Sequence, residues 1–468
     1  MRDLYDVAVV GAGPAGYTAA LKASGLGLNV LLAEKEQVGG VCLNRGCIPS
    51  KCLLSDAENV HWSKRAAAAG IINKPLAVNY AAMVRRKNLV VNKIVTNLGK
   101  HLQASGVHLL AEKVAVTEPG HLETQSGAIV NAEKVILATG SKPFIPSIQG
   151  FNLPGVITTR QMLDLEELPS ELVIIGGGVI GQEFAWLSAV LGSSVTILEM
   201  LPRVLAEVDE EIARRYASFL PALGIKTETG SKILSIEQQD GRLVVVYVKG
   251  EKEKRISADK VLVACGRKPN LCGIELDGLA LEPSTGAVLV DPSLKTSIED
   301  IYAVGDATGR KMLAHVASYH GEIAAFNIGG YERTCRDDVV PSCIFTWPQI
   351  AWVGINQEQA LTRGLSFRTS VFPLSASGKA KALEENIGLI KLIEDRSSGK
   401  IIGAHLLGPN VSELIGEAAL AVRMGSTAQD LVETIHAHPT IAEAFREAAM
   451  GFLDGPIHSA PRVKSFSL

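Results

Sequence analysis

A glycine-rich segment occurs twice in this chain, and it restricts the fold more than any other feature of the sequence. Residues 11–16 read Gly-Ala-Gly-Pro-Ala-Gly, and residues 176–181 read Gly-Gly-Gly-Val-Ile-Gly. Each segment follows an apolar, strand-like run, opens a helix-like stretch, and leads to a second apolar run that ends in an acid. Glu34 lies 23 residues after the first glycine of its copy, and Glu199 lies 23 residues after the first glycine of the other. A single copy is weak evidence, but two copies in one register predict two βαβ units that each bind a dinucleotide.

The glycines in this pattern have distinct tasks. The first makes a tight turn, the second lets the backbone approach a pyrophosphate, and the third lets the helix pack closely on the strand. The alternative is a glycine-rich βαβ turn that binds nothing. The predicted binding residues of the two turns are Gly11, Gly13, Gly16, Gly176, Gly178 and Gly181.

The two acids predict which nucleotide is bound. A carboxylate at the end of the second strand accepts hydrogen bonds from an adenosine ribose, and it repels the 2′-phosphate of NADP. Glu34 and Glu199 are therefore predicted ribose-binding residues, and Glu199 favours NAD over NADP. Arg203 is the nearest base and is the one feature that points the other way.

Three later segments are predicted to complete the two nucleotide sites. The buried strand at 135–138 ends in Thr139-Gly140-Ser141, and its counterpart at 261–265 ends in Gly266. A third apolar strand, at 301–304, ends in Gly305-Asp306. A carboxylate at that position lies beside a ligand and is able to hold a ribityl hydroxyl, or it is a simple strand-end cap.

Length and composition agree with an α/β protein of several domains. The chain has 468 residues, which corresponds to about three domains. Its net charge of −3 gives no reason to expect a nucleic acid or an anionic membrane as a partner. No apolar run is long enough to span a bilayer, and a strand-like run begins within the first ten residues, so neither a membrane span nor a leader is expected. The expected location is the cytoplasm, although a processed organelle protein has the same features.

Two of the seven cysteines, Cys42 and Cys47, stand close together in the segment Gly39–Lys51. An odd count in a long chain argues against a structural disulfide framework. Around one turn of distorted helix, this spacing brings two sulfurs within bonding distance, and the flanking glycines supply the backbone freedom. The alternatives are a pair of inert buried thiols and a zinc site. Zinc needs about four ligands, and the sequence offers no second pair of suitable spacing apart from His436 and His438.

A histidine near the C-terminus is the candidate base for thiol chemistry. Thiols with a pKa of about 8.5 are mostly protonated at neutral pH, so oxidising a dithiol needs a base. Residues 436–443 read His-Ala-His-Pro-Thr-Ile-Ala-Glu. They belong to a region of strand-like and helix-like runs that is predicted to be a separate α+β domain. Taken alone, a His-x-His sequence on a loop is weak evidence of function.

Together these motifs resemble the pyridine nucleotide–disulfide oxidoreductase family over nearly the whole chain. The resemblance implies the fold class: α/β, with two Rossmann-like dinucleotide-binding domains, for FAD and NAD, and a C-terminal α+β dimerisation domain. The implied divisions are an FAD-binding domain at 1–146 and 271–338, an NAD-binding domain at 147–270, and a dimerisation domain at 339–468. It also implies a tightly bound FAD, an exchanging NAD and a homodimer.

The resemblance assigns roles to individual residues. Cys42 is expected to exchange with the substrate, while Cys47 faces the flavin. His438 is the expected base and Glu443 its partner, and the resemblance implies that His438 reaches the cysteine pair of the other subunit. Other cofactor-binding residues implied by the resemblance are Lys51 with Glu183 as an ion pair beside the flavin, Ile180 over the nicotinamide pocket, and Met312, Leu313, Ala314 and His315 lining the flavin.

Within the family, the chain is most similar to the members that oxidise dihydrolipoyl groups with NAD. Those members act on the lipoyl domain of a 2-oxo acid dehydrogenase or glycine cleavage complex. A glutathione-type reductase is an alternative, but it uses NADPH, which Glu199 disfavours. A non-catalytic scaffold or regulator in a multienzyme complex is another, but it would be expected to have lost at least one working residue. Gln349, where an acid is more usual, and the tail Ile457–Leu468 depart from the family pattern.

Overall fold

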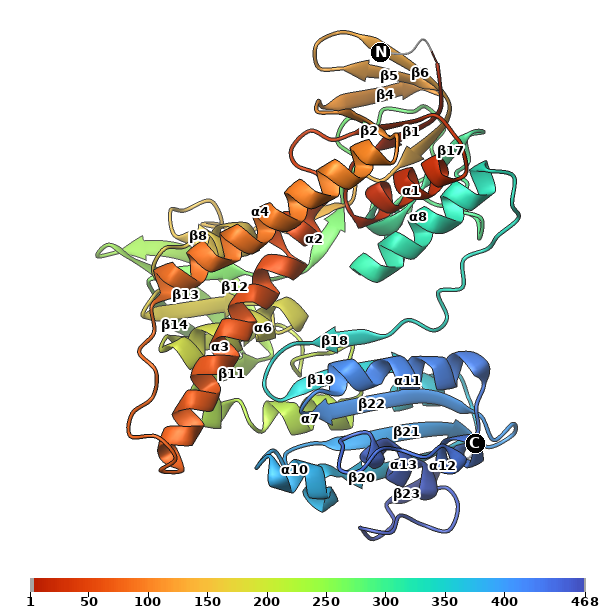
Figure 1. Cartoon of the computed structure of the whole chain (residues 1–468). Coiled ribbons are helices and arrows are strands. Elements are labelled where there is room, and N and C mark those ends of the chain that lie inside the picture. Colours follow the sequence, from red (N-terminus) through yellow and green to blue (C-terminus); the bar gives the residue numbers. More distant parts are fainter. Residues whose placement is uncertain (1–3, 467–468) are drawn as a thin grey trace.

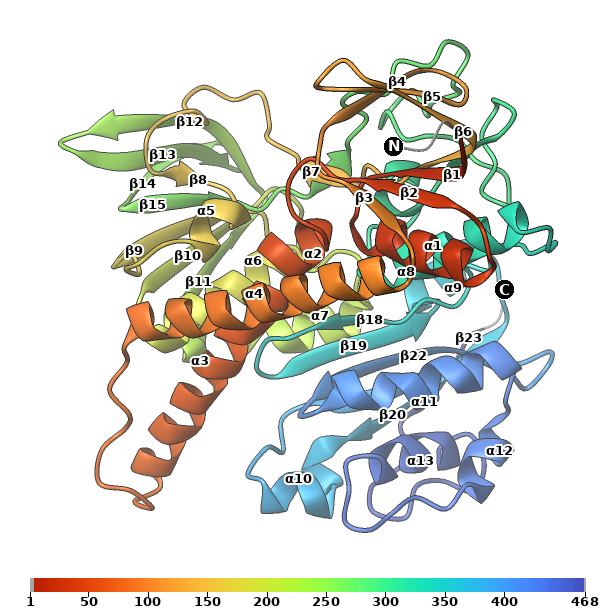
Figure 2. The ribbon, with the colours of Figure 1, turned by 45° about the horizontal axis from the view of Figure 1, so that its top comes forward.

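A computed structural model describes residues 4–466 of the chain. Two α/β parts and a C-terminal part built on an antiparallel sheet lie around a long pair of helices (Figures 1 and 2). Across these described residues, no helix is long and apolar enough to cross a membrane.

The first α/β part is built on a seven-stranded sheet with the order β3-β2-β1-β6-β5-β4, and β17 pairs with β6. Strands β1, β2, β3, β6 and β17 run parallel where they pair, so their carboxyl ends meet at one edge, where the first glycine turn lies. Helix α1 packs against α8, from much later in the chain (Figure 1). The elements are β1 (Tyr5–Val10), α1 (Pro14–Gly25), β2 (Val30–Ala33), β3 (His108–Leu110), β4 (Val114–Glu118), β5 (His121–Thr124), β6 (Ile129–Leu137), β17 (Ile301–Ala303), the 3₁₀ turn η2 (Gly305–Thr308) and α8 (Ala314–Ile328).

The second α/β part has a five-stranded parallel sheet in the order β11-β10-β9-β15-β8. An antiparallel meander, β12-β13-β14, packs beside it, and helix α6 follows the second glycine turn. The elements are β8 (Val156–Ile157), α5 (Thr159–Leu163), β9 (Glu171–Ile175), α6 (Val179–Leu191), β10 (Ser194–Glu199), α7 (Glu210–Ala217), η1 (Pro221–Leu223), β11 (Ile225–Thr229), β12 (Ser231–Gln239), β13 (Arg242–Lys249), β14 (Lys252–Ala258) and β15 (Lys260–Val263).

The chain enters and leaves the second α/β part at one place. Strand β7 (Ser141–Pro143) leads into it and β16 (Arg267–Pro269) leads out, and the two pair antiparallel. The second α/β part is therefore inserted between the two halves of the first.

Three helices lie between the sheets: α2 (Gly40–Arg45), α3 (Cys47–Ala68) and α4 (Tyr80–Ala104). Gly46, with φ −144° and ψ −110°, separates α2 from α3. The Asn79 side chain accepts a hydrogen bond from the Ala82 N–H and caps α4. The expected single turn of distorted helix between the two cysteines is thus a break between two helices, because the backbone at Gly46 leaves the helical region.

The C-terminal region is a six-stranded antiparallel sheet in the order β18-β19-β22-β21-β20-β23 with helices packed against it. The elements are β18 (Ser342–Ile344), β19 (Gln349–Gly354), α9 (Gln357–Thr362), β20 (Phe367–Pro373), η3 (Leu374–Ala376), α10 (Gly378–Ala382), β21 (Leu389–Asp395), β22 (Ile401–Gly408), α11 (Val411–Met424), α12 (Ala428–Glu433), α13 (Glu443–Met450) and β23 (Val463–Phe466).

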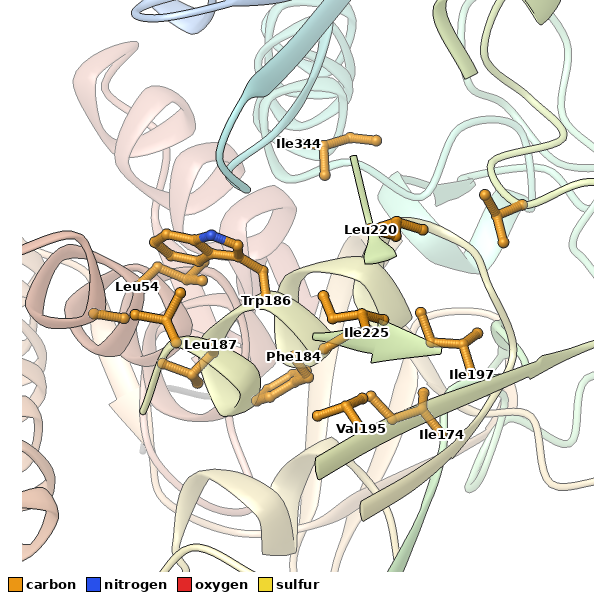
Figure 3. Close-up of a cluster of buried hydrophobic side chains, with 14 of the residues drawn as sticks. Leu54, Ile174, Phe184, Trp186, Leu187, Val195, Ile197, Leu220, Ile225 and Ile344 are labelled. Carbon is orange, nitrogen blue, oxygen red and sulfur yellow. The ribbon is translucent and has the colours of Figure 1, made fainter. Parts of the chain in front are cut away.

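One hydrophobic cluster joins three regions of the molecule: the helices α3 and α4, the second α/β part and the C-terminal region. Leu54 of α3, Trp186 of α6 and Ile344 of β18 belong to it, together with strand residues of the second sheet such as Ile174 (Figure 3). Because each region contributes side chains to the same buried cluster, their relative positions are fixed by packing. The predicted fold class, two dinucleotide-binding units and a C-terminal α+β region, is confirmed.

Candidate active site

The two predicted nucleotide turns have nearly the same backbone geometry. The first glycines, Gly11 and Gly176, have φ of +101° and +109°, a region open to glycine but strained for other residues. A Cβ added to Gly16 would lie 1.8 Å from the Gly11 carbonyl oxygen, and one added to Gly181 would lie 2.0 Å from that of Gly176. Glycine is therefore required at the first and third positions of both turns.

The acids at the ends of the second strands are held in the same way. Glu34 accepts hydrogen bonds from the N–H groups of Ala12 and Glu36, at 2.8 and 2.9 Å. Glu199 accepts them from Gly177 and Leu201, at 2.6 and 2.8 Å. Each carboxylate is thus fixed at the mouth of its glycine turn, where an adenosine ribose would lie.

The middle glycines differ. The Cα of Gly40 lies 4.0 Å from where a Cβ on Gly13 would be, and the Gly39 N–H donates to the Ala12 carbonyl at 2.7 Å. A Cβ on Gly178 would meet nothing within 4 Å. At the first turn, the segment that leads to the cysteines packs on the middle glycine. At the second turn, the Leu205 N–H donates to the Gly177 carbonyl at 3.0 Å, and the middle glycine is left open.

A charged chain of hydrogen bonds holds the predicted ribityl acid. Ser141 donates to Asp306, and the Arg267 Nε donates to the Ser141 hydroxyl at 2.8 Å. Burial lowers the pKa of Arg267, and the charges of Asp306 and Cys47 oppose that effect. Arg267 was not among the residues predicted from the sequence. The available signal was a base directly after Gly266, in the segment that mirrors Thr139–Ser141.

Two further observations at this edge fit FAD. Thr139 has a buried side-chain oxygen without a hydrogen-bond partner, beside the turn at Gly140. The glycine turn also presents the N-terminus of α1, which begins at Pro14, and such a helix end favours a pyrophosphate. The residues therefore suit a flavin dinucleotide whose ribityl chain passes Asp306.

His320 holds the backbone at Gly305, next to Asp306. The Gly305 N–H donates to His320 Nδ1 at 3.3 Å, so the ring proton is on Nε2 and points to Asp337, at 3.2 Å. His320, Cys335 and Asp337 have ligand atoms within 4.8 Å of one another. Because both ring nitrogens of His320 are used, this group is explained as support for the Gly305 turn rather than as a metal site.

The cysteine pair lies where the first glycine turn, α2 and α3 meet. Cys42 is partly buried in α2, and Cys47 is the exposed first residue of α3; both are thiols in this structure. A hydrogen bond between the sulfurs lowers the pKa of Cys47 to about 7, with the Lys51 charge acting in the same direction. The same hydrogen bond raises the pKa of Cys42. The pair is thus polarised, with Cys47 as the thiolate and Cys42 as the donor.

Lys51 and Glu183 form the predicted ion pair. The Lys51 Nζ lies 2.9 and 3.0 Å from the two Glu183 oxygens, and it lies 4.7 Å from the ring centroid of Phe345. The Phe345 N–H also donates to Glu183, at 3.1 Å. The ion pair, which is about a helical turn from Cys47, thus joins α3 and α6 to the C-terminal region. Phe345 was not predicted from the sequence, because only the folded chain brings the end of β18 to this place.

The remaining predicted cofactor residues lie at the starts of two helices. Ile180 is in the first turn of α6, beside the ion pair's Glu183. Met312 and Leu313 precede α8, and Ala314 and His315 open it. The His315 Nε2 lies 2.9 Å from the Pro341 carbonyl, so this ring is tied to the connection into the C-terminal region.

His438 and Glu443 are joined as predicted. The His438 Nδ1 lies 2.8 Å from a Glu443 oxygen, and the other oxygen accepts from the Thr440 N–H at 2.8 Å. The side chain of His438 is 79% exposed, so its Nε2 faces outward. His436 is instead held between Glu417 and the Thr434 carbonyl, which agrees with a structural role.

The cysteine pair and His438 lie in different regions of the fold. In both views, strands of the C-terminal sheet lie between α2, which carries Cys42, and α13, which follows His438 (Figures 1 and 2). One chain therefore holds the cysteine pair at one place and the exposed His438 at another.

Known proteins resemble the chain along its full length. Residues 5–321 match the sequence family described as pyridine nucleotide-disulphide oxidoreductase, and residues 340–449 match its dimerisation domain. The dihydrolipoyl dehydrogenase of Chlamydia muridarum is 38% identical over 472 residues, covering 99% of this chain and 100% of the relative. That of Halobacterium salinarum is 38% identical and covers 98% of each. Among solved structures, the HOCl-induced flavoprotein disulfide reductase RclA from Escherichia coli is 28% identical, with a TM-score of 0.85 over 95% of this chain and 99% of that one.

Proposed function

Because the chain belongs to the pyridine nucleotide–disulphide oxidoreductase family, we propose that it oxidises protein-bound dihydrolipoyl groups to the cyclic disulfide and reduces NAD⁺ to NADH. The observation that carries the redox chemistry is the position of the two thiols, Cys42 in α2 and Cys47 at the start of α3, about a helical turn from the Lys51–Glu183 ion pair. The choice of a dihydrolipoyl substrate rests on full-length relatives at 38% identity.

We assign FAD to the first nucleotide unit and NAD to the second. The close approach of Gly40 to Gly13 suits a resident cofactor, and the Asp306 carboxylate and the unpartnered Thr139 hydroxyl are polar groups beside the first turn that are available to it. The proposed divisions are 1–146 with 271–338 for the flavin, 147–270 for the nicotinamide, and 339–468 for dimerisation.

The preference for NAD over NADP is supported by the contacts of Arg203. Its guanidinium donates to the Val208 and Ala206 carbonyl oxygens, both at 3.0 Å. It is therefore engaged by its own loop, whereas Glu199 stands at the mouth of the turn. A 2′-phosphate would meet the carboxylate before it met this engaged guanidinium.

The protein's own groups carry out the thiol chemistry in the following order. His438 Nε2 accepts the proton of one substrate thiol, and the resulting thiolate attacks Cys42 of the oxidised pair, which breaks the Cys42–Cys47 bond. The second substrate thiol loses its proton to water, and its sulfur attacks the substrate sulfur of the mixed disulfide. The bond to Cys42 breaks, the cyclic disulfide is released, and Cys42 leaves with the proton held by His438. The two electrons now reside on the Cys42–Cys47 pair, and Lys51 stabilises the Cys47 thiolate. FAD, when bound, supplies the electron transfer from this pair to the nicotinamide.

A homodimer completes this site. His438 is exposed, and α13, which follows it, lies across the C-terminal sheet from α2, which carries Cys42 (Figure 1). We therefore propose that His438 serves the cysteine pair of a second subunit. The proposed partner is the lipoyl domain of a 2-oxo acid dehydrogenase or glycine cleavage complex, and the proposed compartment is the cytoplasm, where free thiols persist.

A second candidate function is disulfide reduction in the reverse direction on another substrate. The likeness to the Escherichia coli reductase favours it, since the two structures agree at a TM-score of 0.85. The lower identity, 28% against 38%, ranks it second.

Anaerobic titration tests the proposal. Dihydrolipoamide added to the flavin-loaded protein should produce a long-wavelength absorbance band from the Cys47 thiolate against the oxidised flavin. Cys42→Ser should keep such a band as purified, and Cys47→Ser should lack it. Turnover with NAD⁺ should exceed turnover with NADP⁺. A missing band rejects the thiolate mechanism, and faster turnover with a non-lipoyl disulfide than with dihydrolipoamide favours the second candidate.

A further inference from the structure

A buried ion pair joins the second α/β part to the C-terminal sheet. The Lys391 Nζ lies 2.9 and 3.0 Å from the two carboxylate oxygens of Asp209, and these residues are 1% and 0% exposed. Lys391 belongs to β21, and Asp209 directly precedes α7, which lies beside the C-terminal sheet (Figure 1). Lys391 also donates to the Gln357 side-chain oxygen at 3.0 Å and lies 3.2 Å from Glu211. Because an ammonium group has three donors, these acceptors fix its position at the start of α7.

Asp209 is also the end of the loop that packs over the second nucleotide turn. Residues 200–208 connect the predicted ribose acid, Glu199, with Asp209, whose carboxylate caps α7. Within this loop, the Leu205 N–H donates to the Gly177 carbonyl at 3.0 Å, and the Gly177 N–H donates to Glu199 at 2.6 Å. The loop is therefore held at three places: the ribose acid, the glycine turn and the buried ion pair.

The backbone of this loop is strained where it meets the turn. Leu205 has a φ of +52°, in the left-handed region that residues with a side chain rarely adopt. Such a conformation persists only where the surrounding contacts determine it fully. Val204, Leu205 and Val208 are buried in the hydrophobic cluster, and the Val208 N–H donates to the Leu205 carbonyl at 3.0 Å. Packing on one side and the anchor at Asp209 on the other thus hold Leu205 against the nucleotide turn.

We propose that Lys391 is a positioning residue for the second nucleotide. Through Asp209 and the loop at 200–208, it holds Glu199 and the turn at Gly177 in the arrangement that binds NAD. This role rests on the proposed assignment of NAD to the second unit. The C-terminal region thereby contributes to nucleotide affinity, although Lys391 lies in β21 and outside the nucleotide-binding sheet.

Lys391→Met tests the proposal, and Lys87→Met is its matched control. Lys87 is also buried, at 2% exposure, and also joins two regions, because it lies on α4 and donates to the Leu163 carbonyl of α5 at 2.6 Å. Both variants lose a buried ammonium group, so the midpoint of thermal unfolding should fall in both. Only Lys391→Met should weaken nucleotide binding, because it leaves the Asp209 carboxylate buried without its cation and frees the start of α7.

Calorimetric titration of the flavin-loaded protein with NAD⁺, without any dithiol, measures binding apart from the redox reaction. The Kd for NAD⁺ should rise by about 5-fold or more in Lys391→Met and stay unchanged in Lys87→Met. In turnover, the KM for NAD⁺ should rise by the same factor in Lys391→Met. The kcat, the KM for dihydrolipoamide and the flavin bound per chain should not change, which separates positioning of the nucleotide from a general loss of structure.

Asp209→Asn decides the case if Lys391→Met does not fold. This variant keeps the cap of α7 and an acceptor for Lys391 and removes only the charge, so the Kd for NAD⁺ should rise by a smaller factor, about 2-fold. An unchanged Kd in the variants that fold, or an equal rise in Lys87→Met, would overturn the proposal. Weaker NAD⁺ binding in Lys391→Met, together with a natural protein that does not oxidise dihydrolipoamide, would support the positioning role and reject the proposed reaction, so the two ideas fail separately.

Discussion

The two nucleotide units of this chain are close copies at the turn and differ in what covers it. Gly11 and Gly176 share their strained φ, and Glu34 and Glu199 are held by equivalent backbone N–H groups. Over the first turn, however, Gly40 packs against Gly13, while nothing lies near Gly178 among the described residues. The sequence repeat is thus matched by a repeat in backbone geometry, and the two turns differ in the segment that packs over them.

The cover also links cofactor and chemistry in the first unit alone. The segment that closes the turn, Gly39–Gly40, opens α2, which carries Cys42. Over the second turn, the Leu205 N–H donates to the Gly177 carbonyl at 3.0 Å, and the covering segment there, Val204–Leu205, carries no cysteine. Substitutions at equivalent positions of the two units should therefore have different effects on flavin retention and on NAD-dependent turnover.

The largest effect is expected from the third glycines. In Gly16→Ala and Gly181→Ala the new Cβ meets a backbone oxygen at 1.8 and 2.0 Å, so both turns must shift. Gly16→Ala should yield protein without flavin and with stability lowered by several kcal/mol, on the order of 3 or more. Gly181→Ala should keep its flavin and lose most NAD-dependent turnover. Flavin absorbance per chain and thermal unfolding measure both.

The matched control is Gly25→Ala, at the end of α1, where a Cβ meets nothing within 4 Å. If Gly181→Ala lost flavin as readily as Gly16→Ala, the assignment of cofactors to the two units would be wrong.

Substitution of the strand-end acids, Glu199 and Glu34, is expected to have the second-largest effect. Glu199→Gln removes the charge that repels a 2′-phosphate, so the preference for NAD over NADP should fall by about 10-fold, equivalent to about 1.4 kcal/mol. Glu34→Gln should leave that preference unchanged and weaken flavin retention. Steady-state kinetics with both nucleotides decide. An unchanged preference in Glu199→Gln would indicate that Arg203, rather than Glu199, determines the choice between NAD and NADP.

A smaller effect concerns α3, which has no counterpart in the second unit. The sulfur–sulfur hydrogen bond and Lys51 lower the pKa of Cys47 to about 7, so the thiolate is present above that pH and is lost as pH falls through it. Lys51→Met should move the midpoint of the charge-transfer band to higher pH, by about 1 unit or less. Titration of the band in the two-electron-reduced protein measures this.

Lys64→Met is the control for Lys51, because Lys64 lies on the same helix but donates to the Val190 carbonyl. A midpoint that is unmoved by Lys51→Met would mean that Cys42 alone stabilises the thiolate.

The smallest effect is expected at the equivalent turn residues, Thr139 and Cys265. Cys265 lies 3.5 Å from the Ile175 carbonyl, and burial raises its pKa to about 11, so it is an unreactive thiol. Cys265→Thr makes the second turn resemble the first, and it should change stability by less than about 1 kcal/mol with no change in kcat. Thr139→Cys should instead weaken flavin binding. Equal effects would show that the Thr139 oxygen has no ligand.

Local motifs could be predicted from sequence, because glycine φ, strand-end acids and cysteine spacing depend on neighbours along the chain. The turns around Gly11 and Gly176 are examples, and so is the His438–Glu443 contact across five residues. Contacts set by distant packing could not be predicted from the residues themselves, and the one that was expected, between Lys51 and Glu183, came from the family resemblance. Arg267 reaches Ser141 across 126 positions. Phe345 meets Glu183 only because one hydrophobic cluster joins three regions of the molecule.

The antiparallel pair of β7 and β16, where the chain enters and leaves the second unit, has a consequence for the order in which the units fold during synthesis. The second unit runs without interruption from β8 to β15, so it is able to fold as soon as it leaves the ribosome. The first sheet must wait for β17, which begins at Ile301, and its flavin acid, Asp306, follows still later. During synthesis, the first unit begins before the second unit but is completed after it. A ribosome-bound chain that stops before Ile301 should therefore bind nicotinamide nucleotide but should not retain flavin.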